Sequence, residues 1–190
     1  NAFKVNEDVV IPLPRMGDYC DGIERINIEL STQNKLALCD ALTEFLQGEL
    51  PLDTGDATIS RDELIGDHVK DALEHIAQVR RRWQWLLDNL DLPLAAAEPQ
   101  FADYGVVAGE RTNRAANPIL FHRLQDYSVR TSWKTELRSR LDKIFDGVLF
   151  APVREGLKKV HKQVLRGRVF VALHMHAGDG NVHTNIPVNS

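Results

Sequence analysis

The sequence lacks most of the features that mark secreted, membrane or disulfide-rich proteins. It contains only 2 cysteines, Cys20 and Cys39, in 190 residues. On one continuous helix they would lie roughly 28 Å apart at 1.5 Å per residue, too far for a disulfide. No run approaches the roughly 18 consecutive apolar residues of a membrane-spanning helix, and the N-terminus does not resemble a signal peptide. We therefore expect reduced thiols and a cytoplasmic protein without a membrane span.

Positive charge is not in excess either. Lys and Arg total 23 against 27 Asp and Glu, which gives a formal net charge of −4. This balance provides no electrostatic basis for binding nucleic acid. The chain also lacks a G-x-x-x-x-G-K phosphate loop and a G-x-G-x-x-G dinucleotide fingerprint. Its content of hydrophobic residues, 43%, is enough to bury the core of one domain.

Residues 16–166 are predicted to be mostly helical, because apolar residues recur there at intervals of three and four. The expected helices run from Asp18 to about Gly48, from a Ser60 cap to about Leu90, through Leu120–Leu124 and Trp133–Val148, and onward from Pro152. Residues 91–118 show little periodicity and predict a long irregular crossing. The run Arg80-Arg81-Arg82 is predicted to lie on the solvated side of the second helix.

The most informative segment lies near the end of the chain, in His174-Met-His-Ala-Gly-Asp-Gly-Asn-Val-His183. Apolar runs on either side predict two strands, and Asp179-Gly180 between them is favoured for a two-residue hairpin turn. With that turn, His176 is expected opposite His183, and His174 opposite Asn185. All four would then lie on one face of the hairpin, since side chains alternate along a strand.

Three histidines on one strand face indicate a metal or anion site. Cross-strand partners have Cβ atoms roughly 4.5–5.5 Å apart, a separation at which two imidazoles can share one ion. Imidazole ligands suit zinc, iron or manganese, and a site with few protein ligands keeps positions open for a substrate. A structural interpretation stays open beside this one, because Asp179 and Asn181 are also ordinary turn residues.

At these residues the chain resembles a known family. His176-Ala-Gly-Asp-Gly-Asn-Val-His183 matches the H-x-G-D-G-N-x-H pattern of the C-terminal domain of FAD-linked oxidases, which include D-lactate, glycolate and D-2-hydroxyglutarate dehydrogenases. The resemblance implies that His176 and His183 bind a divalent metal beside the flavin, and that Asn185 contacts a 2-hydroxy acid. It also implies a glutamate ligand further along such chains, and FAD bound mainly by a domain that this chain does not contain.

A second patch carries the same resemblance more weakly. Lys4 and Asp8-Val-Val-Ile-Pro12 are similar to the K-x-D-x-S-x-P strand that opens this domain in the family. Lys4 lies two residues too early, and Asn6 occupies the position of the family's substrate-binding lysine. Residues 4, 6 and 8 share a strand face, so Lys4 and Asn6 are candidate substrate-binding residues. A solvated edge strand explains the same residues equally well.

These observations predict an α+β fold: a small antiparallel sheet made by the 4–11 strand and a 168–188 hairpin, with a mainly helical insertion packed against it. The whole of residues 1–190 would be part of one FAD-linked oxidase C-terminal domain, inactive alone and joined in the full-length protein to an FAD-binding domain. His183 and His174 are the candidate proton acceptors in oxidation of a small 2-hydroxy acid. Two alternatives stay open, a stand-alone metal-dependent hydrolase with Asp179 as base and a helical interaction module.

Overall fold

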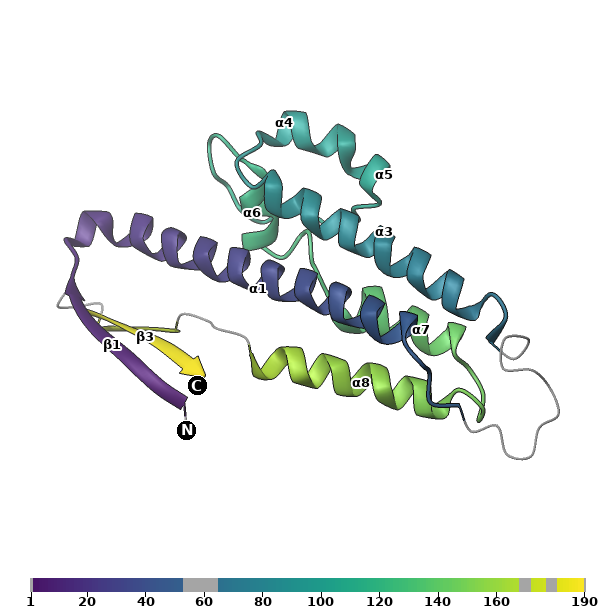
Figure 1. Cartoon of the computed structure of the whole chain (residues 1–190). Coiled ribbons are helices and arrows are strands. Elements are labelled where there is room, and N and C mark those ends of the chain that lie inside the picture. Colours follow the sequence, from purple (N-terminus) through teal and green to yellow (C-terminus); the bar gives the residue numbers. More distant parts are fainter. Residues whose placement is uncertain (1, 53–64, 168–171, 177–180, 190) are drawn as a thin grey trace.

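The computed structural model describes residues 2–52, 65–167, 172–176 and 181–189, with side chains described for residues 10–52 and 65–167. Two parts are visible in Figure 1. The helical body comprises residues 13–52 and 65–167, and the three-stranded ribbon comprises the strands at the two ends of the chain. Among the helices of the described ranges, none is long and apolar enough to cross a membrane.

The helical body is built on two long helices and a third that packs beside the first. Its described elements are η1 (Leu13–Arg15), α1 (Met16–Gln47), α3 (His68–Asp88), α4 (Leu94–Ala97), η2 (Glu98–Gln100), α5 (Phe101–Tyr104), α6 (Leu120–Gln125), the π-helix η3 (Trp133–Arg138), α7 (Ser139–Ile144) and α8 (Ala151–Arg166). Helix α1 packs against α3 along one side and against α8 along another. The predicted ends at Gly48 and Pro152 are confirmed, since Gly48 caps α1 and Pro152 lies in the first turn of α8.

Apolar side chains at helical spacing form the core where α1 meets α3. Leu42 on α1 and Val79 and Trp83 on α3 are fully buried. Burying one such side chain contributes roughly 1.5–3 kcal/mol. The contact with α8 is so close that a methyl group added at Gly156 would collide with the Phe45 ring. Glycine at this position therefore lets α8 approach α1.

The α+β fold class expected from the sequence is wrong, and the fold is helical. Every residue of the buried cluster lies on a helix of the body or on a connection between its helices, from Leu36 to Leu157. The helices bury their apolar stripes against one another, so they need no sheet as a packing surface. Val10, at the end of the first strand, is 75% exposed.

The three-stranded ribbon joins the two ends of the described chain. Its strands are β1 (Ala2–Val10), β2 (Ala172–His176) and β3 (Asn181–Asn189), in the spatial order β1-β3-β2 with both pairings antiparallel. The helical body follows β1 and precedes β2 in the chain (Figure 1). For these strands the structure describes the backbone, so positions are given as register and face.

Two further expectations need correction. The predicted irregular crossing of residues 91–118 contains the short helices α4, η2 and α5, ended by Gly105 at φ 66°. Arg82, predicted to be solvated, is only 21% exposed and forms an ion pair with Glu136. Helical spacing alone did not reveal these features, because both depend on tertiary partners. The expected Ser60 cap lies outside the described residues.

Candidate functional site

The strand register brings sequence-predicted residues from both ends of the chain onto one face of the ribbon. In the antiparallel pairing of β1 with β3, Asp8 lies opposite His183. In the pairing of β2 with β3, His174 lies opposite the same His183. Because β3 is the middle strand, these three residues form one row across the ribbon. Direct cross-strand partners have Cβ atoms roughly 4.5–5.5 Å apart.

This register differs from the one expected for an Asp179-Gly180 turn. His176 lies opposite Asn181 rather than His183, so the hairpin pairing is shifted by two residues. A shift of two keeps every residue on its face, whereas a shift of one would move His183 to the other side. His174 is now the direct partner of His183, and His176 is its diagonal neighbour. The turn itself, within residues 177–180, lies outside the described residues.

The candidate substrate residues fall on the same face. Asn6 lies opposite Asn185, and Lys4 lies opposite Pro187, both in even steps along β1 from Asp8. Asn185 is also the register partner of Ala172 on β2. Asn6, Asn185 and Lys4 therefore occupy register positions on the same face as the histidine row. Hydrogen-bond donors of this kind are suited to an anionic substrate beside a metal.

Asp8 is the residue that sequence reasoning missed. In the sequence, Asp8 belongs to the 8–12 segment of the strand resemblance, which implies no role for it. The sequence predicts that the 4–11 strand joins the hairpin in one sheet, but it does not show which hairpin strand pairs with β1 or in which register, because the whole helical body lies between them in the chain. One signal was present in the sequence: side chains alternate along a strand, so Asp8 shares its strand face with residues 4 and 6.

The donor set on this face fits a divalent metal. Imidazole nitrogens and a carboxylate are the donors of many zinc, iron and manganese sites. His174, His176 and His183 supply the first kind, and Asp8 supplies the second. Among the residues whose side chains are described, no group of three or more histidines, cysteines and carboxylates is placed to hold a metal. The ribbon face, where these residues share one side in the strand register, is the candidate site.

In the described part of the helical body, a half-buried polar cluster surrounds Glu136 on the π-helix η3. Its carboxylate pairs with Arg82 and accepts hydrogen bonds from Trp83 Nε1 at 3.0 Å and from the Ser132 N–H at 2.7 Å. His75 Nε2 lies 2.6 Å from the Glu136 carbonyl oxygen. π-Helical turns often occur at functional sites. Here the carboxylate already has three partners, two on α3 and one at the N-cap of η3, so its evident role is to hold η3 against α3.

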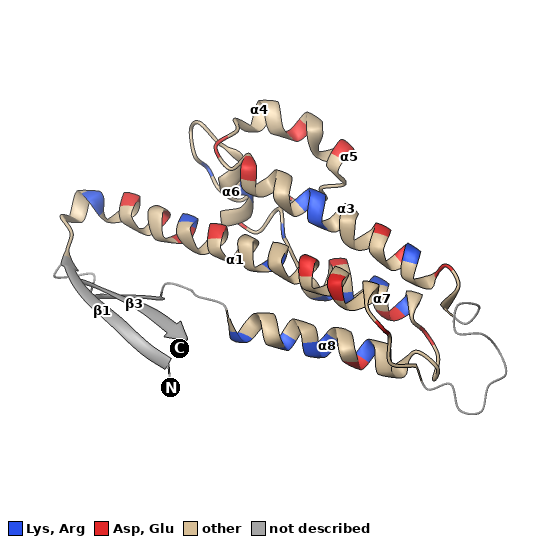
Figure 2. Cartoon of the chain, viewed as in Figure 1, with Lys and Arg blue, Asp and Glu red and all other residues tan. Residues whose placement is uncertain are grey.

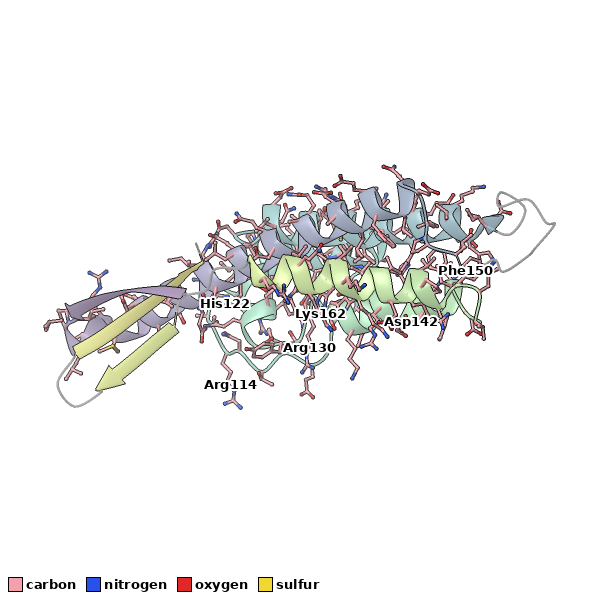
Figure 3. The ribbon with its side chains drawn as sticks, turned by 60° about the horizontal axis from the view of Figure 1, so that its bottom comes forward. Arg114, His122, Arg130, Asp142, Phe150 and Lys162 are labelled. Carbon is pink, nitrogen blue, oxygen red and sulfur yellow. The ribbon has the colours of Figure 1, made fainter. Side chains whose placement is uncertain are left out.

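Two cavities, of about 690 Å³ and 490 Å³, share Tyr127, Val129 and Arg130 in their linings. Tyr127 has φ 60°, in the left-handed region, and is 70% exposed. Arg130 lies 5.9 Å from the Tyr127 ring, and Figure 3 shows its side chain extending away from the helices. Neither described lining includes a histidine or a cysteine. The cavities therefore lack the residues that the sequence singled out for metal or proton-transfer chemistry.

Titratable groups of the helical body are shifted by structural causes. Burial raises the pKa of the Cys39 thiol to about 12, so this cysteine is unreactive near neutral pH. Partial burial opposes ionisation of Asp126, but hydrogen bonds from the backbone of Asn113 and Ser128 outweigh it and bring the pKa of Asp126 to about 2. Positive and negative side chains are interspersed over most of the body (Figure 2).

Comparison with known proteins adds no assignment: no family model, no curated protein and no solved structure matches this chain.

Proposed function

We propose that this chain is the substrate- and metal-binding part of an FAD-dependent oxidoreductase that oxidises a 2-hydroxy acid. The observation that carries the proposal is the segment His176-Ala-Gly-Asp-Gly-Asn-Val-His183, which matches all six specified positions of the family pattern. The backbone register supports it, because the two histidines at the ends of this segment keep the same face of the ribbon. Asn185, Lys4 and Asn6 share that face.

In this proposal, His176 and His183 hold the ion, which is zinc, manganese or iron. The chemistry that a bound divalent metal supplies in such a site is Lewis-acid polarisation of the substrate oxygen, which lowers the pKa of the alcohol. FAD supplies the hydride acceptor and is expected to be held mainly by another domain of the full-length protein.

The chain's own residues divide the remaining tasks. Both His183 and His174 were candidates for the proton acceptor, and His183 is assigned to the ion. His174, its direct neighbour across β2 and β3, is therefore the in-chain group proposed to take the hydroxyl proton. Asn185 donates a hydrogen bond to the substrate, and the ammonium group of Lys4 attracts its carboxylate.

The partners and location follow from the same proposal. A small 2-hydroxy acid and the FAD-binding domain are the proposed partners, and the net charge of −4 gives no reason to add nucleic acid. We place the protein in the cytoplasm. Cys20 and Cys39 both lie on α1, where the helix holds them roughly 28 Å apart and prevents a disulfide.

The test uses the full-length protein with His176→Ala and His183→Ala, assayed with a panel of D-2-hydroxy acids. Loss of a metal ligand is expected to abolish oxidation while the flavin absorbance stays normal, because the flavin is held elsewhere. Asn185→Ala is expected to reduce kcat/KM about tenfold, since one neutral hydrogen bond is worth roughly 0.5–1.5 kcal/mol.

His161→Ala is the matched control. This histidine stacks on Trp133 in the helical body, with ring centroids 4.4 Å apart, and shares no element with the ribbon. It should retain turnover. Near-normal oxidation by His176→Ala or His183→Ala would show that the segment is structural and would end the proposal.

A further inference from the structure

We propose that the adjoining cavities of the helical body form a binding site for a small organic anion, and that Arg130 binds the carboxylate or phosphate group of this ligand. The inference is independent of the proposed function, because both described linings consist of residues of the helical body. The site binds a ligand without transforming it.

The larger cavity provides the space. It measures about 690 Å³ and is lined by α1 and by residues 124–132. Small-molecule sites usually measure about 300–1,000 Å³ and combine apolar walls with a few polar groups. The lining has this composition, with Ile28 and Val129 among its apolar residues and the hydroxyl groups of Ser31 and Ser132 among its polar ones.

Arg130 supplies the donors for an anion. Its Nε donates to the Tyr127 carbonyl at 3.0 Å, and its Cζ lies 5.9 Å from the centre of the Tyr127 ring. Its two terminal nitrogens have no partner among the described residues. Because Arg130 is exposed and lines both cavities, these nitrogens lie where the cavities open to solvent. A guanidinium presents such donors in a fork that matches a carboxylate or a phosphate.

The other charged residues of the two described linings already have partners within the helical body: Lys35 donates to Thr131, Glu24 accepts from Gln125, and Arg82 pairs with Glu136. These contacts hold neighbouring segments of the body together. Arg130 is therefore the charged residue of the linings that is available to a ligand.

The backbone at Tyr127 positions Arg130. Tyr127 has φ 60°, in the left-handed region that non-glycine residues rarely adopt. Its carbonyl and its ring are the two groups that hold the Arg130 side chain. Strained residues of this kind cluster where the backbone fixes a binding group in place. Tyr127 is thus a positioning residue for the guanidinium.

The surrounding charge favours an anion. Residues 111–166 contain 13 Lys and Arg against 5 Asp and Glu, whereas residues 1–110 contain 9 against 21. His161 stacks on Trp133, so the largely basic helix α8 lies against η3, which directly follows Ser132 of the lining (Figure 2). A positive field at a cleft raises the local concentration of anions. The overall charge of −4 conceals this local excess.

The experiment measures ligand affinity by isothermal titration calorimetry of the full-length protein. The probes are inorganic phosphate, succinate and, as a neutral compound, glycerol. We expect at least one of the two anions to bind and glycerol not to bind. Arg130→Gln should weaken anion binding roughly tenfold, because it removes hydrogen bonds between charged groups. Added salt should weaken binding by the wild type as well, since salt screens exposed charges.

Two variants test the positioning role of Tyr127. Tyr127→Phe keeps the ring and the backbone conformation and should bind the anion as wild type does. Tyr127→Gly removes the ring and relieves the backbone strain. It should weaken anion binding while the protein stays folded, a loss of affinity that a purely structural role would not produce.

Arg114→Gln is the matched control. Arg114 is another exposed arginine of the basic 111–166 segment, and it belongs to neither described lining (Figure 3). This variant loses the same charge and should bind the anion as wild type does. Far-UV circular dichroism of each variant checks that the helical body stays folded.

Three outcomes would overturn the proposal. If neither phosphate nor succinate binds more tightly than glycerol, the helical body has no anion site. If Arg130→Gln and Arg114→Gln weaken binding equally, the anions respond to general charge and Arg130 is not their ligand. If His183→Ala abolishes anion binding and Arg130→Gln does not, the anions bind at the ribbon, and the proposed function stands without a site on the body.

Discussion

The helical body and the three-stranded ribbon differ in what their residues do. In the helical body, buried apolar side chains pack between α1, α3 and α8, and the half-buried carboxylate of Glu136 is bonded by two residues of α3 and by Ser132. On one face, the ribbon carries three histidines, an aspartate, a lysine and four asparagines, as the strand register shows. Packing residues and chemistry-bearing residues therefore occupy separate parts of the molecule.

This separation is compatible with the proposal that the chemistry belongs to the ribbon. Strand pairing fixes which residues are neighbours without requiring a large core, whereas the helices supply stability through burial. A change in one part should then leave the other largely unaffected, since residues that share no partners act independently. The following predictions test that independence, in order of decreasing effect.

The largest effect is expected from Trp83→Ala in the helical body. Trp83 is fully buried and its Nε1 donates to Glu136 at 3.0 Å. Removing the indole should lower the free energy of unfolding by about 3–5 kcal/mol, measured by urea unfolding followed by circular dichroism. Trp83→Phe, which keeps most of the volume but loses the hydrogen bond, should cost less.

His183→Ala is the comparison on the ribbon and should leave the same urea transition unchanged. If instead this ribbon variant destabilised the body as much as Trp83→Ala, the two parts would form one cooperative unit. The separation of stability from chemistry would then be wrong.

The same contrast explains what the sequence could and could not predict. The ends of α1 and α8 were predictable because a glycine and a proline mark them locally. The pattern of histidines was equally visible, because it is contiguous. The all-helical core was not predictable, since an apolar stripe such as that of α3 can pack equally well against a helix or a sheet.

For the candidate site, the strand register is the feature that the sequence did not predict correctly. A turn prediction placed His176 opposite His183, but a two-residue shift puts His174 there. Local sequence preferences cannot distinguish the two hairpin registers, because both registers place the same residues on each face of the hairpin. The position of Asp8 opposite His183 depends on the register between strands at opposite ends of the chain, which no local pattern encodes.

An intermediate loss of stability is expected on substitution of Asp126, which holds a loop of the helical body through hydrogen bonds. Its carboxylate accepts hydrogen bonds from the backbone N–H groups of Thr112, Asn113 and Ser128, each at 2.9 Å. Asp126→Ala should cost about 2 kcal/mol, in the range for hydrogen bonds to charged groups.

The pH dependence of stability gives a second measure of the same site. The folded pKa of Asp126 is about 2, below the unfolded value of roughly 3.9. Its contribution to stability is therefore present above about pH 4 and is lost as the pH falls toward 2. Wild type should lose stability relative to Asp126→Ala across this window in acid urea titrations. Parallel curves for the two proteins would contradict this assignment.

The smallest effect is expected at Tyr127, where the helical body itself holds a strained residue. Tyr127 is the one non-glycine residue with positive φ in the described part of the chain, and a left-handed conformation costs a non-glycine residue roughly 1–2 kcal/mol. Tyr127→Ala keeps that strain and loses the contact with Arg130, whereas Tyr127→Gly relieves the strain. The glycine variant should therefore be more stable than the alanine variant by about 1 kcal/mol, in matched urea titrations.

Turnover measurements test whether the strained backbone at Tyr127 contributes to the functional site. Strained backbone is often retained where it serves a binding or catalytic site, and Tyr127 borders both cavities of the helical body. If chemistry belongs to the ribbon alone, Tyr127→Gly and Tyr127→Ala should oxidise 2-hydroxy acids in the full-length protein at the wild-type rate. A loss of turnover in both variants, with the stability order as expected, would show that the body contributes to the site. The Tyr127 segment of the helical body would then have to be counted with the ribbon as part of the functional site.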